Sequence, residues 1–285
     1  MTKKKRIMIW VLCLSVALAA LIAWIAWGNT ALELTKYTVP GESLPAPFEG
    51  YRIAQVSDLH NAEMGEGNHR LLTMLKDTEP DIIVITGDFV DSEHTDVAIA
   101  LDFAKEAVAI APCYYVTGNH EAMTEAYETL KEGLLALGVT VLENARVELE
   151  REGETITLMG VLDPSFSSDG MLATDDAVMK HTLDALTSET DGYTVLLSHR
   201  PELFDTYVDS GVELVFCGHA HGGQFRLPFV GGVVAPGQGL FPAYDAGVYT
   251  QADTHMVVSR GIGNSIIPLR INNRPEVVVV ELAKD

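Results

Sequence analysis

The chain has 285 residues, of which 47% are hydrophobic, so it can bury a large core and is too apolar to be disordered. Its formal charge is -21, from 19 basic and 40 acidic residues. Such a surface repels nucleic acid backbones, which proteins bind through dense Lys and Arg, so we expect no nucleic acid partner. Three cysteines without CxxC spacing predict neither a disulfide framework nor a thiolate metal site.

The N-terminus combines a basic flank with a long apolar run. Residues 3–6 are all basic, and residues 7–27 carry no charged side chain. The run is long enough to cross a bilayer, and Trp24 and Trp27 lie where interfacial aromatic residues are common. We therefore expect a cytoplasmic flank over residues 1–6 and a transmembrane signal anchor over residues 7–27.

The position of the basic flank also predicts the topology. Lys and Arg next to a membrane span favour the cytoplasmic side, which predicts a single-pass cell membrane protein whose remaining domain is extracytoplasmic. A cleaved signal peptide is an alternative, although the run is longer than a usual signal core and no small-residue pair closes it cleanly. A buried helix of a soluble protein is a further alternative. The lack of a twin arginine favours the general secretory route.

The next segment, residues 28–50, is polar and contains Pro40, Gly41, Pro45 and Pro47. This composition predicts a linker between the membrane and a domain that spans residues 51–285.

From residue 51, short apolar runs with β-branched residues alternate with amphipathic stretches. We expect buried strands at residues 53–56, 82–85, 114–116, 195–197 and 214–216. We expect helices near residues 71–75, 97–108, 125–137 and 175–186. A hairpin-like region covers residues 139–142, 146–149 and 155–160. This alternation of strands and helices predicts an α/β architecture.

The last third of the chain is different. Residues 222–247 are rich in glycine and proline, and strand-like segments follow at residues 248–250, 255–259 and 277–282. We interpret this part as the second half of a two-sheet sandwich that shares a core with the first half.

Short polar motifs stand at the ends of five apolar runs. They are Asp58-Leu59-His60, Gly87-Asp88-Phe89-Val90-Asp91, Gly118-Asn119-His120-Glu121, Ser198-His199 and Gly218-His219-Ala220-His221. Residues two apart on an extended segment point to the same side, so an Asp-x-His or His-x-His pair can hold one ion. A carboxylate can bridge two cations, and α/β folds place their sites at the carboxyl ends of strands.

Each of these residues has an ordinary alternative role, such as a helix cap or a hydrogen-bonded core histidine. The ordered set of five motifs is much harder to explain in that way. It predicts a site for two metal ions that lie side by side.

The ordered motifs resemble those of the calcineurin-like metallophosphoesterase superfamily, over residues 51–282. A closer resemblance is to membrane-anchored bacterial phosphoesterases similar to the UDP-2,3-diacylglucosamine hydrolase-like proteins. It rests on residues 57–61, 198–202, 218–224, 259–263 and 268–276.

The resemblance implies a four-layer α/β/β/α sandwich of two mixed sheets, preceded here by one transmembrane helix. It also implies two divalent metal ions. The ligands would be Asp58, His60 and His221 for the first ion, Asn119, His199 and His219 for the second, and Asp88 for both. Oxygen and imidazole ligands suit manganese, which we expect, and also iron or zinc.

The implied reaction is hydrolysis of a phosphate ester by a hydroxide that bridges the two ions. His120 would assist without binding metal, Asn119 would also contact the substrate, and Asp91 would orient His120 through a hydrogen bond.

The anchor favours a phosphodiester or pyrophosphate bond of an envelope or lipid-linked substrate. An extracytoplasmic nucleotide or general phosphomonoester, and a non-catalytic metal-binding envelope protein, are the alternatives.

Other branches of the superfamily fit less well. Asp91 is followed by Ser92, without the Arg-Gly of the serine/threonine phosphatases, and the motif lacks the tyrosine of purple acid phosphatases. Outside the motifs, arginines stand out in a chain with few of them. Arginine forks suit phosphate, so we predict that Arg200 and Arg260 bind substrate, with structural ion pairs as the alternative. Glu121 is expected to be structural.

Overall fold

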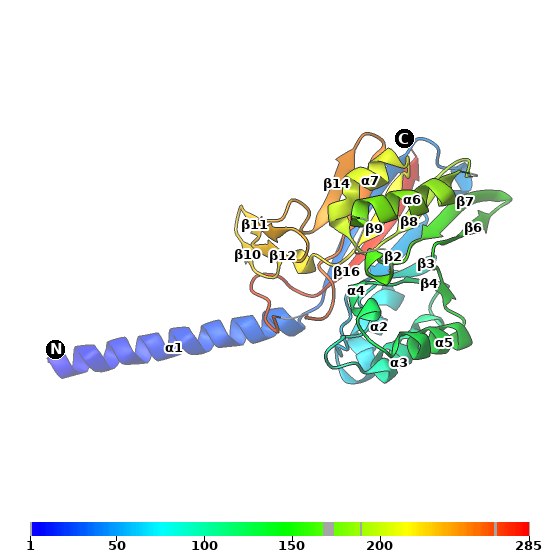
Figure 1. Ribbon diagram of the computed structural model, residues 1–285. Coiled ribbons are helices and arrows are strands. Elements are labelled where there is room, and N and C mark those ends of the chain that lie inside the picture. The colour runs from blue at the N-terminus through cyan, green and yellow to red at the C-terminus, as the bar shows by residue number, and fades with distance from the viewer. Residues whose placement is uncertain (1, 168–173, 189, 265–266, 285) are drawn as a thin grey trace.

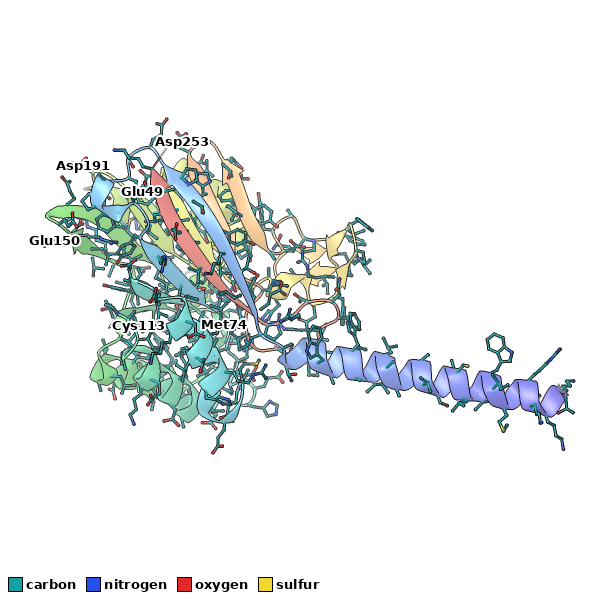
Figure 2. All side chains as sticks on the ribbon, turned by 180° about the vertical axis from the view of Figure 1, so that it is seen from behind. Glu49, Met74, Cys113, Glu150, Asp191 and Asp253 are labelled. Atoms are coloured by element: carbon teal, nitrogen blue, oxygen red, sulfur yellow. The ribbon has the colours of Figure 1, made fainter. Side chains whose placement is uncertain are left out.

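The computed structural model describes residues 2–167, 174–188, 190–264 and 267–284. A long helix, α1 (Lys3–Thr30), leaves one side of a body built on two sheets (Figure 1). None of its described residues is buried, and seen from behind most of the helix extends beyond the body (Figure 2). The expected span, residues 7–27, therefore lies within one helix that is long and apolar enough to cross a membrane.

The first sheet has six strands and is mixed. Their order is β1 (Glu33–Gly41), β16 (Glu276–Lys284), β2 (Arg52–Val56), β3 (Ile82–Thr86), β4 (Cys113–Val116) and β5 (Thr140–Val141). Strands β2 to β5 are parallel to one another, β16 is antiparallel to β2, and β1 is parallel to β16.

The second sheet also has six strands and is mixed. Their order is β14 (Gly247–Gln251), β15 (Thr254–Val258), β9 (Leu214–Cys217), β8 (Thr194–Leu197), β7 (Glu154–Gly160) and β6 (Ala145–Arg151). The four central strands are parallel, and β14 and β6 close the two edges as antiparallel neighbours.

Helices cover the outer face of each sheet, and the two inner faces pack on each other. The first sheet is covered by α2 (His69–Asp77), α3 (Val97–Ala107) and α5 (Tyr127–Leu137), and the second by α6 (Asp175–Thr187) and α7 (Phe204–Asp209). Between the sheets, Ile53 and Val280 of the first share a core with Leu197 and Phe216 of the second. The predicted four-layer α/β/β/α sandwich is confirmed.

Helix α3 shows why these segments become covering helices. Its buried residues are Ala100, Phe103, Ala104 and Ala107, the spacing of one helical face. Asp96 accepts the backbone N–H of Ala98 and satisfies a donor that the first turn leaves free.

The prediction of a linker over residues 28–50 is wrong. Strand β1 pairs with β16 along its whole length, and Leu44 and Phe48 behind it are 2% and 0% exposed. The partner strand lies at the far end of the chain, so nothing near residues 28–50 reveals the pairing. The folded body therefore begins at β1 and not at residue 51.

The division of strands between the two sheets also differs from the prediction. The second sheet begins with β6, well before the last third of the chain, and β16 returns to the first sheet, where it lies between β1 and β2. The placement of β6 and of β16 depends on which strands pair with them. A buried strand has the same apolar sequence pattern in either sheet, so the sequence does not reveal the pairing.

Phe48→Ala should lower the free energy of unfolding by about 3–5 kcal/mol, because it leaves a cavity between the sheets. Lys36→Ala, at an exposed position of β1, should change it by less than about 0.5 kcal/mol. Urea denaturation of the two variants would measure both values, and equal, small effects would show that residues 28–50 are a tether after all.

Candidate metal centre

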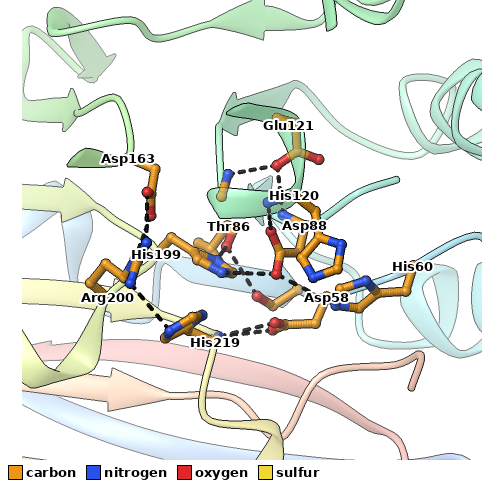
Figure 3. Close-up of polar contacts among 12 residues, drawn as sticks. Asp58, His60, Thr86, Asp88, His120, Glu121, Asp163, His199, Arg200 and His219 are labelled. Carbon is orange, nitrogen blue, oxygen red and sulfur yellow. Dashed lines mark hydrogen bonds and ion pairs between the residues drawn. The ribbon is translucent and has the colours of Figure 1, made fainter. Parts of the chain in front are cut away.

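All five motifs meet where the carboxyl ends of the central strands of both sheets come together (Figure 3). The strands deliver Asp58 and His60 after β2, Asp88 after β3, Asn119 and His120 at the start of α4 (Asn119–Ala122) after β4, His199 after β8, and His219 and His221 after β9. The structure thus brings together every residue that was predicted to bind metal.

The ligand atoms form two groups that share Asp88. In the first group, atoms of Asp58, His60, Asp88 and His221 all lie within 4.8 Å of one another, and in the second, atoms of Asp88, His199 and His219 do. Asp88 Oδ2 is 3.5 Å from His60 Nε2 and 3.2 Å from His199 Nε2. This is the arrangement that a carboxylate bridging two cations requires.

The donor atoms of the cluster fit metal ions. The carbonyl of Thr86 lies 2.8 Å from His199 Nδ1 and can only accept, so Nδ1 carries a proton and Nε2 is the ring atom that faces Asp88 and is placed to bind a metal ion in exchange for its proton. Asn119 Oδ1 is buried and accepts no hydrogen bond within the described part of the chain. Carboxylate, amide and imidazole atoms suit divalent ions such as manganese, iron and zinc.

Electrostatics in the cluster agree with this interpretation. Burial opposes the charged form of Asp88, yet His199 and His60 hold the pKa of this carboxyl well below its usual range. Burial likewise opposes charge on His199, and Asp88 nevertheless raises the pKa of that imidazole to about 10. Two buried side chains that each stabilise the charged form of the other so strongly are typical of a functional site.

The backbone conformation of the predicted ligands directs their side chains toward the cluster. Five of them have a left-handed backbone, with φ of 52° at Asp58, 45° at His60, 48° at Asp88, 64° at His219 and 46° at His221. Each such residue costs on the order of 1 kcal/mol and is found mostly at functional sites. The pairs therefore converge through tight left-handed turns, and not on extended segments as the sequence pattern suggested.

Glycines in the motifs allow the loops to touch. A Cβ on Gly118 would lie 2.3 Å from Asp88 Oδ1, and one on Gly218 would lie 2.4 Å from Asp58 Oδ2. Any side chain at either position would push one ligand loop away from another.

Glu121 ties two of the motifs together. Its carboxylate accepts backbone N–H groups of Asp88 at 2.9 Å, Phe89 at 2.7 Å, Val90 at 3.2 Å and Gly118 at 2.6 Å. The side chain is fully buried, and burial together with the charge of Asp88 raises the pKa of Glu121 to about 7. This geometry agrees with the structural role predicted for Glu121.

His120 lies beside the cluster and lines the adjoining cavity. The backbone N–H of Ser92 donates to His120 Nδ1 at 3.0 Å. An N–H can only donate, so Nδ1 is the acceptor and the neutral ring carries its proton on Nε2. Burial lowers the pKa of His120, which favours this neutral form.

Asp91 differs from its predicted geometry. Its Oδ2 is 3.7 Å from His120 Nδ1, longer than a hydrogen bond, and 3.6 Å from His60 Nδ1. Its Oδ1 accepts the backbone N–H groups of Glu93 and His94 at 3.0 and 2.9 Å. In this structure Ser92, which the sequence reasoning missed, occupies the place expected for Asp91 beside His120.

The two arginines predicted to bind substrate are held in ion pairs. Arg200 forms a two-bond fork with Asp163, at 2.6 and 2.9 Å, and Arg260 contacts Glu276 at 2.8 Å and Glu33 at 3.1 Å. Neither is among the residues that line the cavity at the metal cluster. This is the structural alternative, and substrate binding by either residue stays a prediction.

Arg270 reaches the cluster from outside the motifs. Its guanidinium is 1% exposed and lies 3.4 Å from His221 Nδ1, and burial lowers its pKa to about 10. It donates to the carbonyl of Arg260 at 2.7 Å and to that of Gly263. It lies within residues 268–276, which carry the closer resemblance, but no role was predicted for it.

A cavity of about 700 Å³ opens on the cluster. Its lining includes His60, Asp88 and His221 of the cluster together with Pro236 and Pro268. This volume is typical of a small-molecule site.

Replacing Glu121 should test its clamping role. Glu121→Gln turns one acceptor oxygen into a donor that faces N–H groups, so the free energy of unfolding should fall by about 1.5–3 kcal/mol. Glu125→Gln, at an exposed position nearby, is the matched control. Unfolding curves that coincide for the two variants would mean that the clamp contributes little.

Metal binding should stabilise the fold through the shared carboxylate. Mn²⁺ added to metal-depleted protein should raise the unfolding free energy by about 2.7 kcal/mol at 100-fold excess over Kd, and elemental analysis should find two ions per chain. Asp88→Asn should lose both effects, whereas Asp102→Asn, exposed on α3, should keep them. Two ions retained by Asp88→Asn would refute the bridging assignment.

Residues 51–223 match the family model of calcineurin-like phosphoesterases. The uncharacterized metallophosphoesterase YkuE of Bacillus subtilis (strain 168) is 31% identical over 258 residues, which cover 88% of this chain and 85% of YkuE. Phosphodiesterase YaeI of Escherichia coli (strain K12) is 29% identical over 247 residues, 83% of each protein. A transmembrane protein with a metallophosphoesterase domain from Danio rerio is 28% identical over 86% of this chain and 56% of its own length.

Among solved structures, TT1561 of Thermus thermophilus has a similar fold. The TM-score is 0.52 with 14% identity, over 74% of this chain and 90% of that one. The family match covers more than half of the chain and includes all the metal-cluster motifs. The chain therefore belongs to the calcineurin-like phosphoesterase family, and it is a phosphoric ester hydrolase.

Proposed function

We propose that the protein is a membrane-anchored, binuclear-metal-dependent phosphodiesterase or pyrophosphatase that acts on an envelope or lipid-linked phosphate ester. The observation that supports this most is the position of Asp88 between two groups of buried ligands, at the wall of a cavity of about 700 Å³. Divalent ions held by these residues polarise a phosphoryl oxygen and activate water.

The chain's own residues have separate tasks in this proposal. One ion would be held by Asp58, His60 and His221. The other would be held by Asn119, His199 and His219, and Asp88 would bind both. Manganese is the metal we propose, with iron or zinc as the other candidates.

His120 supplies a proton. The proton lies on Nε2, because Nδ1 accepts the N–H of Ser92 at 3.0 Å. Placed beside the leaving oxygen, the Nε2–H group stabilises the negative charge that develops when the ester bond breaks. Asp91 places its negative charge beside both rings, with Oδ2 3.6 Å from His60 Nδ1 and 3.7 Å from His120 Nδ1.

Membrane attachment supports the choice of substrate. Helix α1 is long and apolar enough to span a bilayer, and we propose that residues 7–27 do so, with the N-terminus in the cytoplasm and the catalytic body outside. Tethering the site to the membrane raises the local concentration of lipid-linked esters. The resemblance to UDP-2,3-diacylglucosamine hydrolase-like proteins is consistent with such a substrate.

The test uses the full chain in detergent micelles with Mn²⁺. It should hydrolyse bis(4-nitrophenyl) phosphate faster than 4-nitrophenyl phosphate, and Asp88→Ala and His221→Ala should abolish turnover. His181→Ala, on an exposed face of α6, is the control. Parental activity in both ligand variants would overturn the site, and faster cleavage of the monoester would overturn the diester preference.

His120→Ala should lower kcat by about 10²–10⁴ and leave the bound metal unchanged. The loss should be larger for a diester with an alcohol leaving group than for one with 4-nitrophenol, because the better leaving group needs less protonation. Equal losses for the two esters would contradict proton donation by His120.

A further inference from the structure

An exposed apolar surface lies outside the catalytic residues. It is formed by two small hairpins, β10 (Arg226–Leu227) with β11 (Gly231–Gly232) and β12 (Val234–Ala235) with β13 (Gly239–Leu240). Its members, here called the hairpin surface, are Leu227 at 48%, Phe229 at 109%, Val230 at 60%, Leu240 at 71% and Phe241 at 61% exposure.

The hairpin surface is uncharged in a strongly acidic protein. Between residues 220 and 252, only Arg226 and Asp245 are charged, and these two form an ion pair at 3.0 Å. Elsewhere the chain carries most of its 40 acidic residues. Exposed apolar side chains gathered in one place mark an interaction site.

The fold itself does not call for aromatic residues at these positions. Phe229 and Phe241 have φ of 67° and 56°, a conformation that glycine or asparagine adopts more easily. Both side chains project into solvent and fill no core. The fold alone gives no reason for a large apolar side chain on such a strained and exposed turn. A binding partner outside the described chain would give one.

The hairpin surface is attached to the end of α1. Gln224, which precedes β10, donates to the carbonyls of Ile267 and Leu269 at 2.7 and 2.8 Å. Arg270, which follows Leu269, is held in turn by Asn29 of α1. The Asn29 side chain accepts the backbone N–H of Arg270 at 2.7 Å and donates to the backbone carbonyl of Arg270 at 2.8 Å. Figure 1 shows the hairpins extending from the body on the side from which α1 leaves it.

We propose that the hairpin surface inserts into the outer face of the bilayer that α1 crosses. The inference depends on the proposed membrane span of α1. A lipid surface is the occupant that fits, because α1 brings the uncharged hairpins next to it. Aromatic and aliphatic side chains on an otherwise uncharged projection are typical of interfacial insertion.

This placement would define how substrate enters. Pro236, between β12 and β13, and Pro268, beside Ile267, line the cavity at the metal cluster. The cavity therefore opens next to the inserted hairpins, and its substrate is a phosphate ester presented by the membrane. Soluble esters reach the same site without any help from the hairpin surface.

The first test measures insertion and needs no activity. Full-length protein with Phe229→Cys, in a Cys13→Ala background, is labelled with an environment-sensitive fluorophore and reconstituted into phosphatidylcholine and phosphatidylglycerol vesicles. The other cysteines, Cys113 and Cys217, are buried. We expect quenching by lipids that are spin-labelled in the acyl chain, and none for Leu135→Cys, an exposed apolar position on α5.

Equal quenching at both positions, or none at Phe229→Cys, would overturn the proposal. A third outcome would also overturn it: the fluorophore at Phe229→Cys is shielded only in samples that mass measurements show to be dimeric. The hairpin surface would then bind a second copy of the chain. If the protein hydrolysed no ester at all, the proposed function would fail while the quenching result would still decide insertion.

The second test measures access. The double variant Phe229→Ser, Phe241→Ser should lower kcat/KM for a phosphodiester lipid in vesicles by about tenfold, with the soluble bis(4-nitrophenyl) phosphate unchanged. Leu135→Ser is the matched control and should change neither. Equal rates of vesicle hydrolysis for the double variant and the control would overturn the role in access.

Discussion

The carboxylate of Asp88 lies between two groups of buried imidazole and carboxylate ligands, and much of the body is arranged around that contact. Its Oδ2 is 3.2 Å from His199 Nε2, at the end of a strand of the second sheet, and 3.5 Å from His60 Nε2, on a loop of the first. Buried polar groups of this kind are costly unless they are paired or bind a metal. The two sheets must therefore stack so that the carboxyl ends of their central strands face each other.

Residues around the ligands keep this geometry in place before any ion binds. Glu121 gathers the N–H groups of two ligand loops, and the Thr86 carbonyl fixes the orientation of His199. The ligand loops are strained, because they contain left-handed turns and bring Gly118 close to Asp88. The contacts of Glu121 and Thr86 stabilise this strained conformation. A site that is preorganised in this way does not need to reorganise during the reaction.

The side of the body from which α1 leaves connects to the same site. Asn29 at the end of α1 binds the backbone of Arg270, and the guanidinium of Arg270 lies 3.4 Å from His221 Nδ1. A continuous set of contacts thus runs from the apolar helix to a metal ligand. The hairpin surface is attached at the same point, and Pro236, between its strands β12 and β13, lines the cavity.

Local patterns, such as Asp58-Leu59-His60 after a buried strand, were enough to predict the candidate ligands, the order of the motifs and the α/β character. The sequence also determined the apolar helix, since span length and charge are local properties. The packed fold was needed to show that β1 belongs to the body, that β16 lies in the first sheet, and that Arg200 and Arg260 are held in ion pairs. Each of these depends on a partner far away in the chain. The same reason explains why Ser92, and not Asp91, meets His120: only the packed sheets bring the two loops together, with the Ser92 nitrogen 3.0 Å and Asp91 Oδ2 3.7 Å from His120 Nδ1.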